Sequence, residues 1–206
     1  MASIEYYFYG SSPFTYLGHQ AICDVADKHG AELVIKPVQI AKLWEKSGSV
    51  PLPQRSETRQ RYRLIELQRI ARWRDLPINL HPAHFPFDAT LSDRCIIALV
   101  EQAEDPRPYM AAAFKAVWVD DADMAQESEI AQRLAQCGHE SDFILGLAQS
   151  WEIEAAHNAN TRDAIELDAI GVPAYAVEGE VFWGQDRIEY LDHMLTTGRK
   201  AFTPNV

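Results

Sequence analysis

Two apolar stretches near the N-terminus flank a segment with helical spacing. Residues 4–9 are almost all isoleucine, tyrosine and phenylalanine, which predicts a short buried strand. Over residues 13–29 the apolar positions recur at loosely helical intervals, and Gly30 is well placed to end a helix. Residues 32–38 contain further β-branched positions and predict a second strand. The chain therefore opens β-α-β, and a right-handed crossover would make its two strands parallel.

The pattern is helical through most of the middle of the chain. Segment 76–86 contains three prolines, which exclude a helix that runs through it. Strand signals return at 174–177 and 181–183, and the Glu178-Gly179-Glu180 turn between them predicts a hairpin. The predicted helices of the middle and end of the chain cover residues 40–46, 57–75, 91–101, 107–117, 127–136, 141–149, 152–167 and 187–196.

The order of these elements predicts the fold class. Two strands at each end of the chain are too few to form a stable sheet alone, so together they should make one four-stranded mixed sheet with helices on its faces. This is an α/β, thioredoxin-like arrangement. Residues 1–53 and 152–206 would form a discontinuous thioredoxin-like domain, and residues 54–151 a large all-helical insertion domain.

Composition and charge narrow the function classes. With 206 residues and 47% hydrophobic residues, the chain suffices for a sizeable core. The formal net charge of -11 disfavours a nucleic-acid partner, which attracts a basic excess. No apolar run approaches the roughly 20 residues that cross a bilayer, and the N-terminus lacks the pattern of a signal peptide. We therefore expect a cytoplasmic protein that has no membrane partner.

The positions of the cysteines, histidines and arginines give little sign of a metal site or a disulfide. Cys23, Cys95 and Cys137 are widely separated, which predicts buried apolar residues rather than a disulfide framework or a zinc site. His81 and His84 have neither a cysteine nor a carboxylate ligand nearby, so no metal is expected. Residues 55–74 contain seven arginines, which indicate either a solvated helix face with Arg–Glu pairs or a site for a small anion.

The first strand–helix turn carries Ser11, Ser12 and Pro13, and it has no cysteine. A serine followed by proline is an ordinary helix start, with a capping hydroxyl and proline in the first turn. A hydroxyl at a helix N-terminus can also hold an anion. Serine hydrolase chemistry is disfavoured, because the Gly-x-Ser-x-Gly elbow is absent. Capping and anion binding both stay open at this point.

Two segments near the C-terminus are further candidates. Val172-Pro173 precedes the third strand, where a proline can simply start a strand. Alternatively, a cis-proline here would leave the backbone of Val172 free to pair with a peptide-like ligand. In Trp183-Gly184-Gln185-Asp186 the aspartate can cap the last helix and the tryptophan can belong to the core. The same segment could instead hold the ammonium and carboxylate of an α-amino acid at a helix N-terminus.

Together these motifs resemble one known family. Ser12-Pro13-Phe14-Thr15-Tyr16-Leu17 looks like a Ser-Pro-aromatic-x-aromatic-Leu motif of that family. Gly171-Val172-Pro173 and Phe182-Trp183-Gly184-Gln185-Asp186-Arg187 look like its C-terminal signature, and Asn160-Thr161 and Ala164 fit as well. On these residues the chain resembles the 2-hydroxychromene-2-carboxylate isomerases, which are relatives of kappa-class glutathione transferases and of DsbA-like oxidoreductases.

The resemblance implies a glutathione-dependent isomerase of aromatic catabolism. Its substrate would be 2-hydroxychromene-2-carboxylate, interconverted with trans-o-hydroxybenzylidenepyruvate, and a homodimer is expected. Ser12 matches the family's catalytic serine, which meets the glutathione sulfur. Val172, before Pro173, matches the residue whose backbone pairs with the tripeptide. The γ-glutamyl end of glutathione would be held by Trp183, Gly184, Gln185 and Asp186.

The chain departs from the family pattern near the expected substrate region. The family often has an acidic residue three positions before the serine, where this chain has Tyr9. The stretch Trp44–Ser49 replaces a family Phe-Lys-x-Thr-Gly-Asn loop, so its lysine and asparagine are changed. The exact substrate therefore stays open. The candidates for substrate contact are Ser49, Arg55, Arg59 and Tyr16, with Arg63 in the same arginine stripe.

Three other functions are alternatives to the isomerase. A kappa-like glutathione transferase would use the same site with another electrophile. A thiol–disulfide oxidoreductase is disfavoured, because exchange needs a thiolate at the helix start and residues 12–15 contain no cysteine. A glutathione- or peptide-binding module without turnover is the third alternative.

Overall fold

A computed structural model of the chain describes residues 2–204. Its four strands form a mixed sheet in the order β2-β1-β3-β4. β1 (Ser3–Phe8) pairs in parallel with β2 (Glu32–Pro37) and antiparallel with β3 (Ala174–Val177). β3 pairs antiparallel with β4 (Glu180–Trp183). The predicted four-stranded mixed sheet is therefore confirmed, and its two central strands come from opposite ends of the chain.

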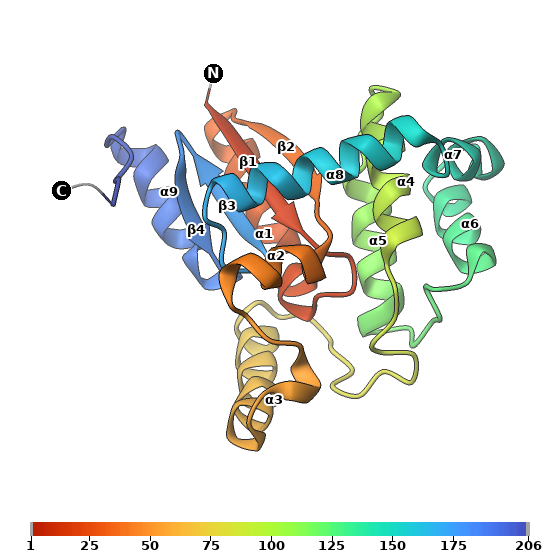
Figure 1. Ribbon diagram of the computed structural model, residues 1–206, viewed down its shortest axis with the longest axis horizontal. Coiled ribbons are helices and arrows are strands. Elements are labelled where there is room, and N and C mark those ends of the chain that lie inside the picture. Colours follow the sequence, from red (N-terminus) through yellow and green to blue (C-terminus); the bar gives the residue numbers. More distant parts are fainter. Residues whose placement is uncertain (1, 205–206) are drawn as a thin grey trace.

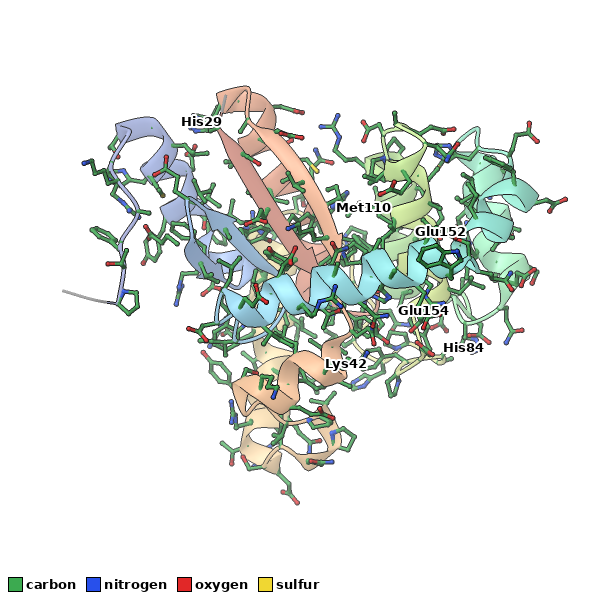
Figure 2. The ribbon with its side chains drawn as sticks, turned by 45° about the horizontal axis from the view of Figure 1, so that its top comes forward. His29, Lys42, His84, Met110, Glu152 and Glu154 are labelled. Carbon is green, nitrogen blue, oxygen red and sulfur yellow. The ribbon has the colours of Figure 1, made fainter. Side chains whose placement is uncertain are left out.

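The helix that follows β1 has clear start and stop signals. α1 (Pro13–His29) begins where the Ser12 hydroxyl accepts a hydrogen bond from the N–H of Thr15, at 3.3 Å. It ends at Gly30, whose φ of 59° lies in the left-handed region that favours glycine. Its first turn has no acidic residue, so no side chain of that turn neutralises the positive end of the helix dipole. Figure 2 marks His29 at the opposite end of α1 from this turn.

Different helices cover the two faces of the sheet (Figure 1). Ile4, Tyr6 and Phe8 point from β1 into a core that also contains residues of α1 and α9 (Ile188–Thr197). Because side chains alternate along a strand, Tyr7 points the other way. There it packs in a smaller core with residues of α2 (Ile40–Ser47) and α8 (Trp151–Glu166).

The predicted insertion is helical along its length. Between α2 and α8 the chain forms η1 (Leu52–Gln54), α3 (Glu57–Trp73), α4 (Thr90–Glu101), α5 (Arg107–Trp118), α6 (Glu127–Gln136) and α7 (Ser141–Ala148). This block shares its core with the sheet, since the rings of Phe8 and Phe114 meet with centroids 5.8 Å apart. The division into two domains stays a prediction. In Figure 1, α4 to α7 lie beside the sheet, whereas α3 lies below its edge.

Most predicted elements agree with the structure to within one or two residues. The long helix predicted to Asp75 ends at Trp73, and Asp75 takes a positive φ of 53°. Cys23 and Cys95 are buried as predicted, and Cys137 is half-buried. Trp118 is a core residue, whereas Trp73 at the end of α3 is 66% exposed. Within residues 2–204, no helix is long and apolar enough to cross a membrane.

We expect opposite stability effects from alanine at two helical glycines. A Cβ on Gly18 in α1 would lie 2.7 Å from the Cβ of Gln185, so Gly18→Ala should lower the free energy of unfolding by about 1–3 kcal/mol. Gly146 in α7 has no atom within 4 Å of such a Cβ, so Gly146→Ala should raise it by about 0.5–1 kcal/mol. Urea unfolding measures both, and equal stabilisation by the two variants would contradict the tight contact at Gly18.

Candidate functional site

The first turn of α1 presents two hydrogen-bond donors that the chain does not use. The Ser12 oxygen accepts from Thr15, but a serine hydroxyl also has one proton to donate. Among residues 2–204 that proton has no acceptor, and the backbone N–H of Phe14 has none either. Ser12 is partly exposed, whereas Ser11 is only 5% exposed, so Ser12 is the serine that a ligand can reach. An anion at this helix end would find both donors and the positive end of the dipole.

A buried carboxyl group lies beneath the turn. Asp93 of α4 is fully buried, and its Oδ2 accepts the backbone N–H of Gly10 at 3.2 Å. Its Oδ1 is also buried and has no hydrogen-bond partner in the described part of the chain. Burial raises the pKa of Asp93 well above its usual range, and the nearby Asp88 adds to the rise. Burial therefore favours the protonated, neutral form of Asp93.

Tyr9 ties the same turn to the segment before α4. Its hydroxyl donates to the carbonyl of Phe87 at 3.3 Å and accepts the N–H of Ala89 at 3.1 Å. Tyr9 replaces the acidic residue that the resembled family often carries at this position. Here the Tyr9 side chain anchors the loop. Because its phenol is neutral, it offers no charge to a substrate.

The sheet register brings the Val172–Pro173 segment beside this turn. Tyr7 of β1 lies opposite Ala174 of β3 in an antiparallel pair, so the residues just before Ala174 continue alongside those just after Tyr7. Neighbouring strands are about 4.8 Å apart. The Val172–Pro173 peptide bond is cis. The backbone N–H and C=O of Val172 have no hydrogen-bond partner within residues 2–204, so they remain available to a ligand.

Two other candidate segments meet at this proline loop. The Ser49 hydroxyl donates to the carbonyl of Ile170 at 3.1 Å, which joins the loop after α2 to the proline loop. The N–H of Gly184 donates to the carbonyl of Pro173 at 2.8 Å. The indole of Trp183 lies over Gly171, with Nε1 3.1 Å from where a Cβ would be, and 46% of Trp183 is exposed. Trp183 is thus a surface residue beside the loop.

Gln185 and Asp186 have different environments in η2 (Gln185–Arg187). Gln185 is 2% exposed and packs on α1, and its Oε1 accepts from Nε of Arg74 at 2.8 Å. A second Arg74 nitrogen donates to the Gln185 carbonyl at 3.0 Å. Asp186 is exposed and pairs with Arg187 at 2.6 Å. Asp186 can reach a ligand directly, whereas Gln185 holds η2 against Arg74.

The predicted substrate residues lie on α1 and around the start of α3. Tyr16 is 9% exposed, and its hydroxyl donates to the carbonyl of Pro77 at 2.7 Å, so its proton is already used. Arg55 donates from Nε to the carbonyl of Val50 at 3.0 Å. Arg59 is exposed and has no carboxylate partner in the described chain. None of these contacts excludes a substrate, and the two arginines leave guanidinium nitrogens free.

The remaining reactive side chains lie away from the turn or are inert. His81 and His84 are exposed, and Figure 2 labels His84 on the loop between α3 and α4. No group of three potential metal ligands occurs in the described residues. Burial raises the pKa of Cys23 and that of Cys95 to about 12, so both thiols stay protonated. A hollow of about 370 Å³ lies against α9 at the other end of the sheet and contains no candidate residue.

Comparison with known proteins places the chain in a family. The model of the DsbA-like thioredoxin domain matches residues 3–196. The chain belongs to this family. Its thioredoxin-like fold is therefore established, although the helix start at Ser12 lacks the cysteine that thiol–disulfide exchange requires.

Within this DsbA-like family the chain is similar to named isomerases. It is 23% identical over 195 residues to a 2-hydroxychromene-2-carboxylate isomerase of Sphingobium xenophagum, covering 94% of this chain and 97% of the relative. It is 25% identical to one of Pseudomonas putida, covering 92% of each chain. A solved 2-hydroxychromene-2-carboxylate isomerase superposes with a TM-score of 0.83 at 22% identity, covering 95% of each chain. The proteins that this chain resembles, at this low sequence identity, are thus named as enzymes.

Asp93 and Arg74 were not found from the sequence, although both shape the site of this DsbA-like chain. Asp93 stands 83 residues from Gly10, and nothing in its local pattern distinguishes it from a surface aspartate. Arg74 stands 111 residues from Gln185 and was one of seven arginines in its stretch. Only the fold shows which polar residues become buried partners.

We expect Asp93→Asn to stabilise the protein increasingly as pH rises. The raised pKa means that the unfolded chain loses this proton near pH 4 while the folded chain keeps it, so wild-type stability falls as pH increases above that value. Asparagine can still accept the Gly10 N–H but has no proton to lose. The variant's advantage in unfolding free energy should therefore grow by up to about 1.4 kcal/mol per pH unit until the folded pKa is reached.

Urea unfolding at pH 5, 6, 7 and 8 tests this expectation. Asp24→Asn, at an exposed position of α1, is the control and should change the unfolding free energy by less than about 0.5 kcal/mol. An advantage of Asp93→Asn that does not vary with pH would show that Asp93 is ionised in the folded protein.

Proposed function

We propose that the chain is a glutathione-dependent isomerase that interconverts 2-hydroxychromene-2-carboxylate and trans-o-hydroxybenzylidenepyruvate. The observation that carries the proposal is the pair of unused donors at Ser12 and Phe14, at the start of a helix that has no cysteine. The similarity to named isomerases over more than nine-tenths of the chain supports the substrate. A cytoplasmic location and a homodimer are part of the same proposal.

The groups around the turn fit a glutathione molecule. The Ser12 hydroxyl and the Phe14 N–H can donate to its sulfur, and the free N–H and C=O of Val172 can pair with its peptide backbone. Trp183, Gly184, Gln185 and Asp186 form the edge where the γ-glutamyl end would lie, with Asp186 exposed to meet its ammonium. Bound glutathione would supply a thiolate for reversible addition to a conjugated carbon of the substrate, which would permit rotation about the former double bond.

The energetics require the donors as well as the helix dipole. A thiol with a pKa of about 8.5 must favour its anion by roughly 2.7 kcal/mol to lower that pKa by about two units. A helix terminus contributes about 0.3–1 kcal/mol. A hydrogen bond to a charged partner contributes about 1.5–3 kcal/mol. The dipole alone is too weak, so we assign Ser12 the role of a donor that stabilises the thiolate rather than that of a nucleophile.

The substrate carboxylate would lie toward the arginines that follow the loop after α2. Ser49 joins that loop to Ile170, and Arg55 and Arg59 follow it in the chain. Tyr16 adds an aromatic wall on α1, although its hydroxyl is bound to Pro77. A kappa-like glutathione transferase would use the same thiolate site with another electrophile. A binding module without turnover would bind glutathione and leave the chromene unchanged.

Replacing Ser12 by alanine should abolish most of the activity. Loss of one hydrogen bond to the thiolate, about 1.5–3 kcal/mol, predicts a fall in kcat of about 10- to 150-fold. The assay follows the ultraviolet spectrum of 2-hydroxychromene-2-carboxylate with purified protein, with and without glutathione. A wild-type protein that produces no glutathione-dependent change would refute the isomerase proposal.

Ser150→Ala is a matched control, because Ser150 caps α8 as Ser12 caps α1, accepting the N–H of Ile153 at 3.4 Å. Each variant loses a cap worth about 1 kcal/mol of stability, but only Ser12→Ala should lose activity. Glutathione should raise the melting temperature of the wild type and of both variants. Full activity in Ser12→Ala would disprove the role of Ser12.

A further inference from the structure

Arg63 of α3 is a half-buried cation that has no carboxylate partner within residues 2–204. Three other arginines of the same stretch have carboxylate partners. Arg61 pairs with Glu57 at 3.1 Å, Arg69 pairs with Glu66, and Arg74 lies 3.4 Å from Glu189. Arg63 has no hydrogen bond or ion pair within residues 2–204. Arg59 and Arg72 also lack an ion pair within residues 2–204, but both are exposed to solvent, whereas Arg63 is half-buried.

The surroundings of Arg63 concentrate positive charge. Burial, together with the positive charge of Arg55, lowers the pKa of the Arg63 guanidinium to about 10. It remains protonated at neutral pH, so the repulsion is present in the ligand-free protein. None of its nitrogens is sealed from solvent, which leaves its donors accessible. A bound anion would relieve the repulsion and use the free donors.

Aromatic rings hold the two guanidinium groups in place. The guanidinium of Arg63 lies 5.6 Å from the ring centre of Phe85, and that of Arg55 lies 5.8 Å from the ring centre of Trp44. Phe85 packs in turn on the core residue Trp118, with ring centres 5.0 Å apart. The cations are therefore fixed against rings rather than extended freely into water.

The segment that carries Phe85 also reaches the turn before α1. Phe87, two residues further on, accepts the Tyr9 hydroxyl, and Tyr9 is followed at once by the turn to Ser12. α3 itself packs against α1. In Figure 1, α3 lies below the end of the sheet where β1 leads into α1. Arg63 is thus on the side of the molecule where Ser12 begins α1.

We propose that Arg63, with Arg55 beside it, is the specificity-determining residue that binds the carboxylate of an aromatic substrate. The inference rests on the proposed function for the location of the reacting carbon, and it adds a residue that selects acids over neutral electrophiles. The planar fork of arginine matches a carboxylate with two parallel hydrogen bonds. The neighbouring rings of Phe85 and Trp44 favour an aromatic body on that carboxylate.

Calorimetric titration with trans-2-hydroxycinnamate tests the proposal without turnover. This aromatic carboxylate lacks the ketone of the substrate, and its neutral amide serves as the matched ligand. Arg63→Gln should weaken binding of the carboxylate about 10- to 100-fold and leave binding of the amide unchanged. Arg63→Lys keeps the charge but loses the fork, so its loss should be intermediate. Arg61→Gln, two positions away and paired with Glu57, should change the affinity less than about fivefold.

The outcomes separate this inference from the isomerase proposal. Equal carboxylate affinity in the wild type and Arg63→Gln would overturn it, as would a wild type that binds the carboxylate no better than the amide. Inorganic phosphate that binds more tightly than the carboxylate would overturn it too. Selective loss of carboxylate binding would support it even if the wild type showed no isomerase activity. Arg63→Gln loses the contact with Phe85 but also the repulsion by Arg55, so its melting temperature should stay close to that of the wild type. If Arg63→Gln fails to fold, Arg63→Lys decides.

Discussion

The pairing of β1 with β3 is the contact on which the site depends. These strands come from opposite ends of the chain, and the register that places Tyr7 opposite Ala174 also places Val172 beside the turn to Ser12. A shift of one residue would send Tyr6 and Tyr7 to the wrong faces, because side chains alternate along a strand. Both faces carry buried side chains from β1, so such a shift would be costly. The two cores therefore fix the geometry of the site.

The turn at Ser12 is held by hydrogen bonds on its inner side and carries unpaired hydrogen-bonding groups on its outer side. Beneath it, Asp93 accepts the Gly10 N–H, and Tyr9 bonds with Phe87 and Ala89. The groups that face outward, on Ser12, Phe14 and Val172, have no partner in residues 2–204. These residues are partly exposed, so water can pair with the groups in the free protein, and a ligand that displaces this water would find donors and an acceptor gathered at one place.

The sequence was sufficient for features that depend on neighbouring residues. The α1 start at Ser12-Pro13, its stop at Gly30 and the hairpin around Gly179 follow from local backbone preferences, and the structure confirms them. The candidate residues for glutathione came from the resemblance, and the structure brings Ser49, Trp183 and Gly184 to the proline loop. The roles assigned to these residues stay predictions.

Features that depend on packing were not accessible from the sequence. Asp93 is separated from its partner Gly10 by 83 residues, and its burial follows from the position of α4. Trp73 is a large aromatic residue of the kind that usually packs in a core, but 66% of its surface is exposed. The seven arginines between residues 55 and 74 look alike in sequence, whereas the fold separates Arg61, Arg69 and Arg74, which have carboxylate partners, from the half-buried Arg63, which has none within residues 2–204.

This difference among the arginines has an electrostatic consequence for a protein of net charge -11. An anionic substrate approaching such a chain is repelled at long range, although salt screens that repulsion beyond about 8–10 Å. Recognition must therefore come from local cations whose charge is not cancelled within the chain. Arg61 and Arg69 pair with Glu57 and Glu66, but Arg55 and Arg63 repel each other and have no carboxylate partner in the part of the chain that the structure describes. The repulsion between Arg55 and Arg63 raises the free energy of the ligand-free protein, and relief of that repulsion by a bound carboxylate would make the site selective for an acid.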